Sequence, residues 1–186
     1  MCLKTFFNIT LSGGMCVIIG NDEAEEEGLL TIAKLMLVSA RTAPKGMGRD
    51  SIVTAILTGD EKDKLTEELL KKRPRDGWSL QQSSVVVLIG VKIPKDTPER
   101  RQNIKLMDLG IAIGSAAKTA MIHNADNRIM ASAGNIAKAM GFLDADHVLA
   151  IPLAATGKNA FWDRTGVYQR LDDGYVYEDL EKYKKL

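Results

Sequence analysis

Apolar residues recur along the chain with two different periods, and the alternation between these periods predicts the order of helices and strands. The first helical pattern follows an acidic turn at residues 23–27, as the positive end of a helix dipole favours. The segment 52–57, Ile-Val-Thr-Ala-Ile-Leu, is rich in β-branched residues and predicts a strand. The apolar positions of the first helix are Leu29, Ile32, Ala33, Met36 and Ala40.

The rest of the chain continues this alternation. A second helix is predicted over residues 60–72, where leucines form one face and charges the other, and Pro74 is expected to end it. Residues 84–91 are nearly all Val, Leu and Ile, which is typical of a buried strand. A long helix follows from about 98 to 125, then a shorter one over 131–140 that Gly141 ends, and a last strand over 147–151.

The long helix carries apolar residues on several faces and many small residues, which predicts a buried central helix that also contacts a second subunit. Its Gly110-x-x-x-Gly114 spacing leaves two interpretations open. Either the glycines allow tight packing inside the domain, or they allow self-association of the chain.

The turn between the first helix and the first strand holds three cations, Arg41, Lys45 and Arg49, and two glycines, Gly46 and Gly48. Glycine lets the backbone approach a ligand closely, so this turn is a candidate site for a phosphate or a carboxylate. The alternative is an ordinary helix end, where basic residues complement the dipole and a glycine makes the turn.

Length, composition and charge limit the number of domains and the classes of partner that we expect. A chain of 186 residues with 45% apolar residues is long enough for one core, so we expect an N-terminal extension over 1–22 and a single domain over 23–186. Met15 is an alternative start to Met1. A net charge of +1 and few aromatic residues argue against nucleic-acid binding, and the longest apolar run is too short to cross a membrane. Only two cysteines indicate a reducing cytoplasm.

Sequence motifs name no catalytic residue. Thr156-Gly157-Lys158 lacks the remaining glycine and hydroxyl residue of a phosphate loop. His123 and His147 lie in different predicted elements without the spacing of a metal site, so no metal is expected. No order of residues indicates a catalytic triad or a pair of catalytic carboxylates.

Five segments carry a resemblance to known proteins, in the order 39–45, 108–115, 126–130, 143–146 and 151–159. They resemble an uncharacterised prokaryotic family described as containing a ferredoxin domain, and the resemblance runs from about residue 23 to residue 164. Members of that family carry a cysteine-rich insertion between the strand matching 85–91 and the long helix, and this insertion supplies the ligands of an iron–sulfur cluster. Here the same place, 92–101, has no cysteine, and a cluster needs about four. We therefore expect no iron–sulfur cluster.

A more distant resemblance links the Ala-Arg-x-Ala-Pro segment, 40–44, to FMN-dependent nitroreductases. It implies an α+β fold with helices around a mostly antiparallel sheet, a long central helix, a homodimer, and FMN at the subunit interface. Three side chains that would touch the flavin differ here, because Lys45, Gly48 and Asp50 stand where that family has Ser, Asn and Gln. The residues expected to bind the cofactor are Ser39, Arg41, Lys45, Gly46, Gly48, Lys158 and Arg164.

Two functions remain from these observations. The first is an FMN-dependent oxidoreductase, in which Arg41 and Lys45 face the late basic residues Lys158 or Arg164 across one pocket. The second is a non-catalytic dimeric module that keeps the scaffold and the basic pocket for another small anion. The altered flavin-contact positions and the absent cysteine-rich insertion favour the second function.

Overall fold

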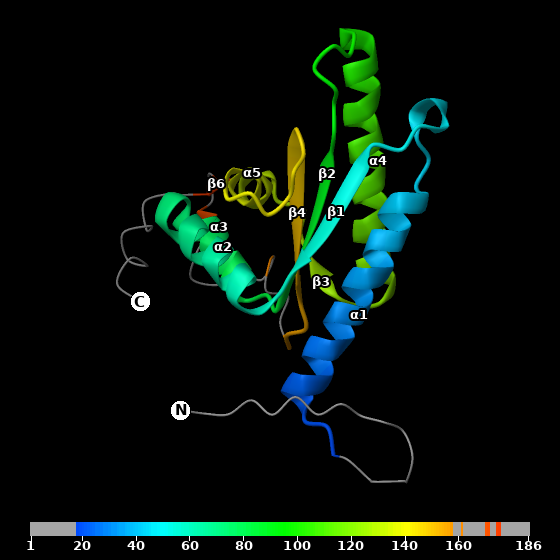
Figure 1. Ribbon diagram of the computed structural model, residues 1–186. Coiled ribbons are helices and arrows are strands. Elements are labelled where there is room, and N and C mark those ends of the chain that lie inside the picture. Colours follow the sequence, from blue (N-terminus) through cyan, green and yellow to red (C-terminus); the bar gives the residue numbers. More distant parts are fainter. Residues whose placement is uncertain (1–17, 158–160, 162–169, 172–173, 176–186) are drawn as a thin grey trace.

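The computed structural model describes residues 18–157, Phe161, and the short strand pairs at 170–171 and 174–175. A four-stranded antiparallel sheet with the order β1-β2-β4-β3 forms the middle of the domain (Figure 1). Its strands are β1 (Ile52–Leu57), β2 (Val85–Val91), β3 (Asp126–Asn127) and β4 (His147–Ala154). A separate pair is formed by β5 (Arg170–Leu171) and β6 (Gly174–Tyr175).

Helices cover both faces of this sheet (Figure 1). One layer consists of α1 (Asn21–Thr42) and α4 (Glu99–Ile122), and a short turn, η1 (Gly46–Gly48), connects α1 to β1. The other layer consists of α2 (Gly59–Lys72), α3 (Pro74–Gln81) and α5 (Ala131–Ala139). The structure is therefore an α+β domain with helices around an antiparallel sheet, as the sequence predicts.

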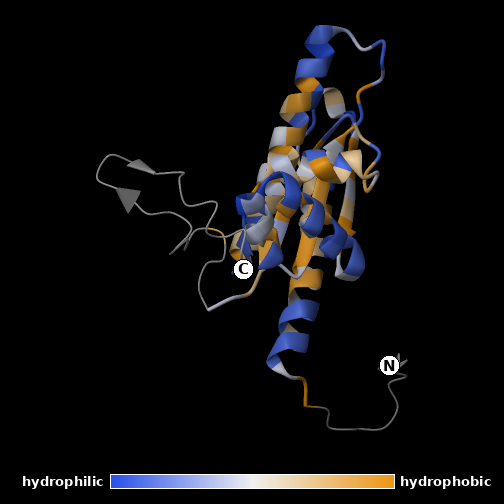
Figure 2. Cartoon of the chain, turned by 90° about the vertical axis from the view of Figure 1, so that its left-hand side faces the viewer, coloured by the Kyte–Doolittle hydropathy of each residue, from blue (hydrophilic) through white to orange (hydrophobic). Residues whose placement is uncertain are grey.

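The central strand β2 explains how the two layers share one sheet. Its side chains alternate between two buried clusters: Val85, Val87 and Ile89 face α1 and α4, whereas Val86 and Leu88 face α2, α3 and α5. Because both faces are covered, every residue of β2 is buried, which accounts for its unbroken apolar run. In Figure 2 the hydrophobic colour runs through the strands of the sheet, while the exposed first turns of α1 are hydrophilic.

Close backbone packing fixes α5 against β4. A Cβ atom added at Gly134 would lie 2.1 Å from the carbonyl oxygen of Val148, so only glycine fits there. Gly77 plays the same role between α3 and α2, where an added Cβ would lie 2.6 Å from the Leu70 backbone. These two glycines bring the α2, α3 and α5 layer close together and close to the sheet.

The helix predicted over 60–72 ends before Pro74, as expected, and Pro74 also begins α3, where its missing N–H costs nothing. One sequence prediction needs correction. The long helix α4 is not buried nearly all round, because Met107, Ile111, Met121 and Ile122 are exposed. Within the described residues, no helix is long and apolar enough to cross a membrane. The predicted N-terminal extension falls mostly outside the described residues.

Candidate functional site

A basic cavity of about 690 Å³ lies where the α1–β1 turn, the loop after β2 and the first turns of α4 meet. The loop after β2 occupies the place where the resemblance described above expects a cysteine-rich insertion. Apolar groups of Met47, Ile52, Val53, Pro94 and Pro98 form part of the wall. Its charged lining residues are the cations Arg41, Arg49, Lys92, Arg101 and Lys105 and the carboxylates Asp50 and Asp96.

Three cations of this cavity keep their charge without a carboxylate partner. The guanidinium groups of Arg49 and Arg101 have no hydrogen bond or ion pair in the described part of the chain. The Lys105 ammonium donates to the carbonyl oxygen of Arg49 at 2.9 Å, which leaves its charge unneutralised. The carboxylate of Asp96 also lines the cavity without an ion pair among the described residues, and it offsets one of these three positive charges. The cavity therefore has an excess of two positive charges.

The other two cations are neutralised. Arg41 Nε lies 3.3 Å from Asp50 Oδ2, and Arg41 Nη1 donates to the carbonyl oxygen of Ile52 at 2.8 Å. Lys92 forms an ion pair with Asp144, and this hydrogen-bonded neighbour lowers the pKa of the Asp144 carboxyl. Arg41 thus lines the cavity, as a predicted binding residue, but it also fastens the start of β1.

The structure places the Lys45 side chain against the C-terminal end of α1, the helix that ends three residues before it. The Lys45 ammonium donates to the carbonyl oxygens of Ala40, Arg41 and Ala43 at 2.6, 2.8 and 2.7 Å. These carbonyls lie at the C-terminal end of α1, where a cation is favourable. Lys45 therefore behaves as the alternative interpretation of the basic turn describes, and it does not line the cavity.

The remaining predicted residues are distributed as follows. Ser39 lies between the helices, where its hydroxyl is 2.8 Å from the hydroxyl and 3.1 Å from the carbonyl oxygen of Ser115. Gly46 and Gly48 form the η1 turn without lining the cavity, and Gly48 has a positive φ of 63° that glycine adopts at low cost. Lys158 and Arg164 lie outside the described residues, so the predicted pairing of Arg41 with a late basic residue stays a prediction.

Sequence analysis missed the α4 contribution to this cavity. Arg101 and Lys105 are one turn apart on α4, and Lys92 directly follows β2, the strand before that helix. A signal for them was present, because cations at i and i+4 at the start of a helix lie on one face. The loop 92–98 was considered only for its missing cysteines, although it carries much of the cavity wall.

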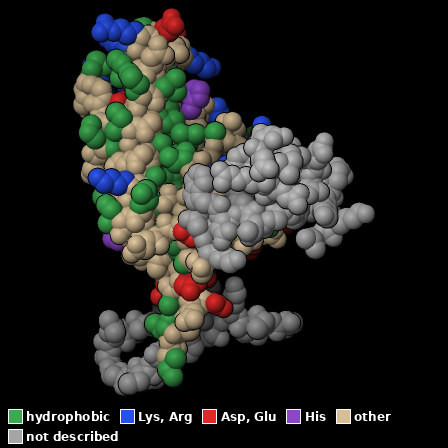
Figure 3. Space-filling model, turned by 180° about the vertical axis from the view of Figure 1, so that it is seen from behind, with side chains coloured by type: hydrophobic (Ala, Val, Ile, Leu, Met, Phe, Trp, Pro, Cys, Tyr) green, Lys and Arg blue, Asp and Glu red, His purple; other side chains and the backbone are tan. Residues whose placement is uncertain are grey.

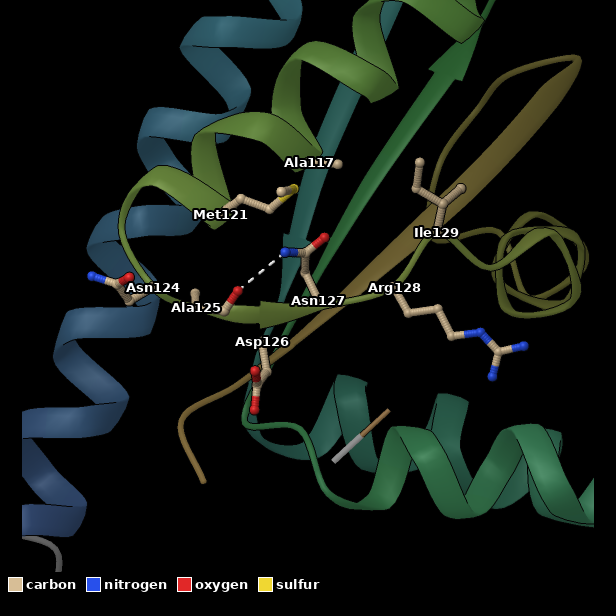
Figure 4. A pocket seen from close by; sticks show the side chains of 8 residues that line it. All are labelled: Ala117, Met121, Asn124, Ala125, Asp126, Asn127, Arg128 and Ile129. Carbon is tan, nitrogen blue, oxygen red and sulfur yellow. Dashed lines mark hydrogen bonds between the residues drawn. The ribbon is translucent and has the colours of Figure 1, made fainter. Parts of the chain in front are cut away.

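A second cavity of about 710 Å³ lies at the other end of α4, against the segment that leads into β3. Its wall combines apolar side chains of Ala117, Met121 and Ile129 with the polar stretch 124–128. Asn127 Nδ2 donates to the carbonyl oxygen of Ala125 at 3.1 Å, which holds this stretch in shape (Figure 4).

Arg128 belongs to the same segment but extends away from α4. Figure 4 shows its side chain pointing toward the α2–α3 layer rather than toward Met121. Burial lowers the pKa of the Arg128 guanidinium, and nearby Asp76 of α3 opposes that effect. The α4 side of the second cavity is therefore mainly apolar.

The surface of α1 and α4 between the two cavities, which we call the outer face, carries exposed apolar side chains. Figure 3 shows hydrophobic side chains spread over the back of the molecule with few charges among them. Gly110 and Gly114 are exposed on this face, and a Cβ added at either would meet no atom within 4 Å. Its exposed apolar residues are Leu35, Val38, Leu106, Met107, Ile111, Met121 and Ile122.

Residues 101–164 match the model of a family described as "uncharacterized protein containing a ferredoxin domain". A relative from Archaeoglobus fulgidus, itself named an uncharacterized protein, is 32% identical over 180 residues, which cover 80% of this chain and 98% of the relative. The chain belongs to this family. The 180 aligned positions outnumber the residues in 80% of this 186-residue chain, so the relative contains residues that have no counterpart in this chain.

Family membership agrees with the resemblance found in the sequence, and solved structures agree on the fold. A protein from Desulfovibrio desulfuricans, provisionally named a nitroreductase and solved with FMN, has a TM-score of 0.55 at 17% identity, covering 69% of this chain and 75% of that one. A nitroreductase with bound FMN from Desulfitobacterium hafniense has a TM-score of 0.50 at 15% identity, covering 71% and 78%. A nitroreductase-like protein from Bacillus cereus has a TM-score of 0.55 at 11% identity, covering 69% and 75%. The fold is nitroreductase-like.

Proposed function

We propose that this protein is an FMN-dependent oxidoreductase that works as a homodimer. Each FMN lies between the basic cavity of one protomer and the second cavity of its partner. The nitroreductase-like fold supports this proposal, because structures with that fold and bound FMN are among its structural neighbours. The observation that carries it is the position of the two cavities at opposite ends of α4, with exposed apolar side chains and two exposed glycines between them.

The spacing along α4 suits a two-fold arrangement. Lys105 lines the basic cavity and Met121 lines the second one, and these residues are about 24 Å apart at 1.5 Å per helical residue. A two-fold axis that crosses α4 near Ile111 and Gly114 makes the two copies of α4 antiparallel. Each basic cavity then lies beside the second cavity of the other protomer, as a self-complementary interface requires.

The glycines of α4 favour this arrangement over tight packing inside the chain. Within the described part of the chain, a Cβ at Gly110 or Gly114 would meet no atom within 4 Å, so packing among these residues does not require glycine there. Glycine in an exposed helix interior costs roughly 1 kcal/mol relative to alanine. Close approach by a second helix gives these two positions a reason for being glycine.

The residues of the two cavities fit the two ends of FMN. A phosphate monoester carries about 1.5 to 2 negative charges at pH 7, which matches the two excess positive charges of the basic cavity. The apolar wall of the second cavity suits a flat ring, and both volumes lie in the range of about 300–1,000 Å³ typical of ligand pockets. When bound, FMN supplies the electron transfer, and the residues of the chain hold its phosphate and orient its ring.

A second function has one specific observation in its favour. Of the three positions that contact flavin in nitroreductases, Lys45 is held by the end of α1, Gly48 has no side chain, and Asp50 is bound to Arg41 and to the Ile52 amide. At these three positions, this chain therefore presents no side chain for the flavin contacts that nitroreductases make there. The alternative is a non-catalytic dimer that binds another phosphorylated small molecule in the basic cavity.

FMN reconstitution of three proteins tests the proposal. Wild type should bind FMN, measured by the change in flavin fluorescence on titration. Arg101→Ala should bind FMN at least tenfold more weakly, because a hydrogen bond to a charged group contributes about 1.5–3 kcal/mol. Arg100→Ala removes the same charge one residue away, outside the cavity lining, and should bind FMN like wild type.

The outcomes separate the two functions. FMN binding that is weakened by Arg101→Ala and not by Arg100→Ala supports the flavin site. If wild type binds inorganic phosphate but no FMN, the protein is an anion-binding module without flavin chemistry. If it binds neither, the basic cavity is not a ligand site and both functions fail.

A further inference from the structure

The turn that forms one wall of the basic cavity is fastened to α4 at both of its ends. Asp108 Oδ1 accepts a hydrogen bond from the Gly46 amide at 2.7 Å. The Lys105 ammonium donates to the carbonyl oxygen of Arg49 at 2.9 Å. Because residues 105 and 108 are one turn apart on α4, a single face of this helix holds the whole turn 46–49.

Gly46 is the residue that makes the first of these contacts possible. A Cβ at position 46 would lie 2.3 Å from Ile104 Cγ2 and 3.5 Å from Asp108 Oδ1. Any larger residue would push the turn away from α4 and draw the amide away from the carboxylate. The glycine here therefore serves the contact with α4, while Met47 and Gly48 carry the positive φ angles of the turn.

The burial of Asp108 is energetically unfavourable, so packing alone does not explain this residue. It is 2% exposed, and its second oxygen, Oδ2, has no hydrogen-bond partner in the described part of the chain. Burying a carboxylate with unmet hydrogen bonds is unfavourable, and Asp is a poor helix former. Met47 adds strain to the same place, because its φ of 58° is uncommon for a residue with a side chain.

We propose that Asp108 is a positioning residue of the basic cavity, because its contact with the Gly46 amide fixes the turn that carries Arg49. Arg49 lies on the turn and Arg101 lies on α4, so the turn–helix contact sets the spacing between these two unpaired guanidinium groups. An anion that contacts both arginines depends on that spacing. This inference rests on the proposed function in so far as the basic cavity binds a phosphate.

The direction in which anion affinity changes distinguishes a positioning role of Asp108 from a purely electrostatic effect of its charge. Asp108 is negative and lies beside a cationic cavity, so removing its charge alone should strengthen anion binding. Asp96→Asn measures that effect, because Asp96 lines the same cavity and forms no hydrogen bond or ion pair with the turn in the described part of the chain. Asp108→Ala removes both the charge and the acceptor, and positioning predicts the opposite result.

The experiment titrates inorganic phosphate into four proteins by calorimetry. Relative to wild type, Asp96→Asn should bind phosphate more tightly, and Asp108→Ala should bind it at least tenfold more weakly. Asp108→Asn keeps an oxygen acceptor for the Gly46 amide, so it should bind at least as tightly as wild type. If Asp108→Ala binds more tightly, as Asp96→Asn does, the positioning role is overturned while the phosphate site stands.

Hydrogen exchange provides a readout that needs no ligand. The Gly46 amide should exchange at least tenfold faster in Asp108→Ala and at nearly the wild-type rate in Asp108→Asn and Asp96→Asn. Should Asp108→Ala fail to fold, Gly46→Ala displaces the turn from the other side, and Ile104→Ala added to it should restore phosphate binding. If wild type binds neither phosphate nor FMN, the proposed function fails, and an unchanged Gly46 exchange rate in Asp108→Ala or Gly46→Ala overturns the positioning role independently.

Discussion

Replacing Gly110 and Gly114 together by glutamine should produce a folded monomer that is more stable than the wild-type monomer. Both sites are exposed positions inside α4, and an added Cβ meets no atom within 4 Å. Glutamine is a good helix former, so each replacement should add roughly 0.5 kcal/mol to the stability of the isolated chain. For a chain of this size, a total of about 1 kcal/mol raises the melting temperature by about 2–4 °C.

The same change should abolish the dimer, because two glutamines prevent the close approach of a second copy of α4. Light scattering measures the mass, and thermal unfolding is followed at several protein concentrations. Wild type should be dimeric, with a melting temperature that rises with concentration. The double variant should be monomeric, with a melting temperature that does not depend on concentration and that exceeds the wild-type value at high dilution.

Gly28→Gln provides the matched control. Gly28 is also an exposed helical glycine with open space around its Cβ position, but it lies in the first half of α1 and lines neither cavity. It should gain the same helix stability and keep the dimer. A wild-type protein that is monomeric at working concentration, or a double variant that keeps the wild-type mass, refutes the proposed interface.

Three further changes test the fold and the separate roles of the basic residues. Gly134→Ala should lower the free energy of unfolding by about 3 kcal/mol, as measured in urea, because its Cβ would lie 2.1 Å from the Val148 carbonyl oxygen. Lys45→Met should cost about 1 kcal/mol at the end of α1 and leave the calorimetric phosphate affinity within twofold of wild type. Lys92→Met should return the pKa of Asp144 toward its ordinary value of 3.8, which NMR titration can measure. With Lys92 present the pKa of Asp144 is lower than in the unfolded chain, so the ion pair stabilises the fold above pH 3.8. This stabilisation is lost as the pH falls through the pKa of Asp144 in the folded state.

Much of the fold follows from sequence periodicity because burial dictates it directly. The strand Val85–Val91 is apolar throughout since helices cover both sides of it, and the helical spacing of Leu29 to Ala40 marks the buried side of α1. Helix α3 could not be found this way. It has eight residues, it begins at a proline that also follows the end of α2, and it contains a glycine required by the neighbouring Leu70 backbone.

The site was only partly predictable for a different reason. The basic turn was visible as a cluster of cations in one short segment, but sequence alone does not say what each cation contacts. Lys45 is held by three carbonyls at the C-terminal end of α1, whereas Arg101 and Lys105, more than fifty residues further along the chain, complete the cavity. Their convergence depends on α4 lying against the turn, which is a tertiary contact and not a local pattern.

The composite position of the flavin is tested most directly by mixing two inactive variants. Arg101→Ala damages the basic cavity, and Ile129→Trp fills the second cavity at the other end of α4. Each variant alone should form a dimer that binds FMN weakly. A mixed dimer, isolated with two different affinity tags, combines the intact basic cavity of one protomer with the intact second cavity of the other.

The proposed arrangement predicts that this mixed dimer binds one FMN with nearly wild-type affinity. A flavin site contained in a single protomer predicts no recovery, because every protomer of the mixed dimer then carries a damaged cavity. Stoichiometric FMN titration of the purified mixed dimer distinguishes the two results. One tightly bound FMN per mixed dimer supports the shared site, and FMN binding as weak as that of the two parent variants contradicts it.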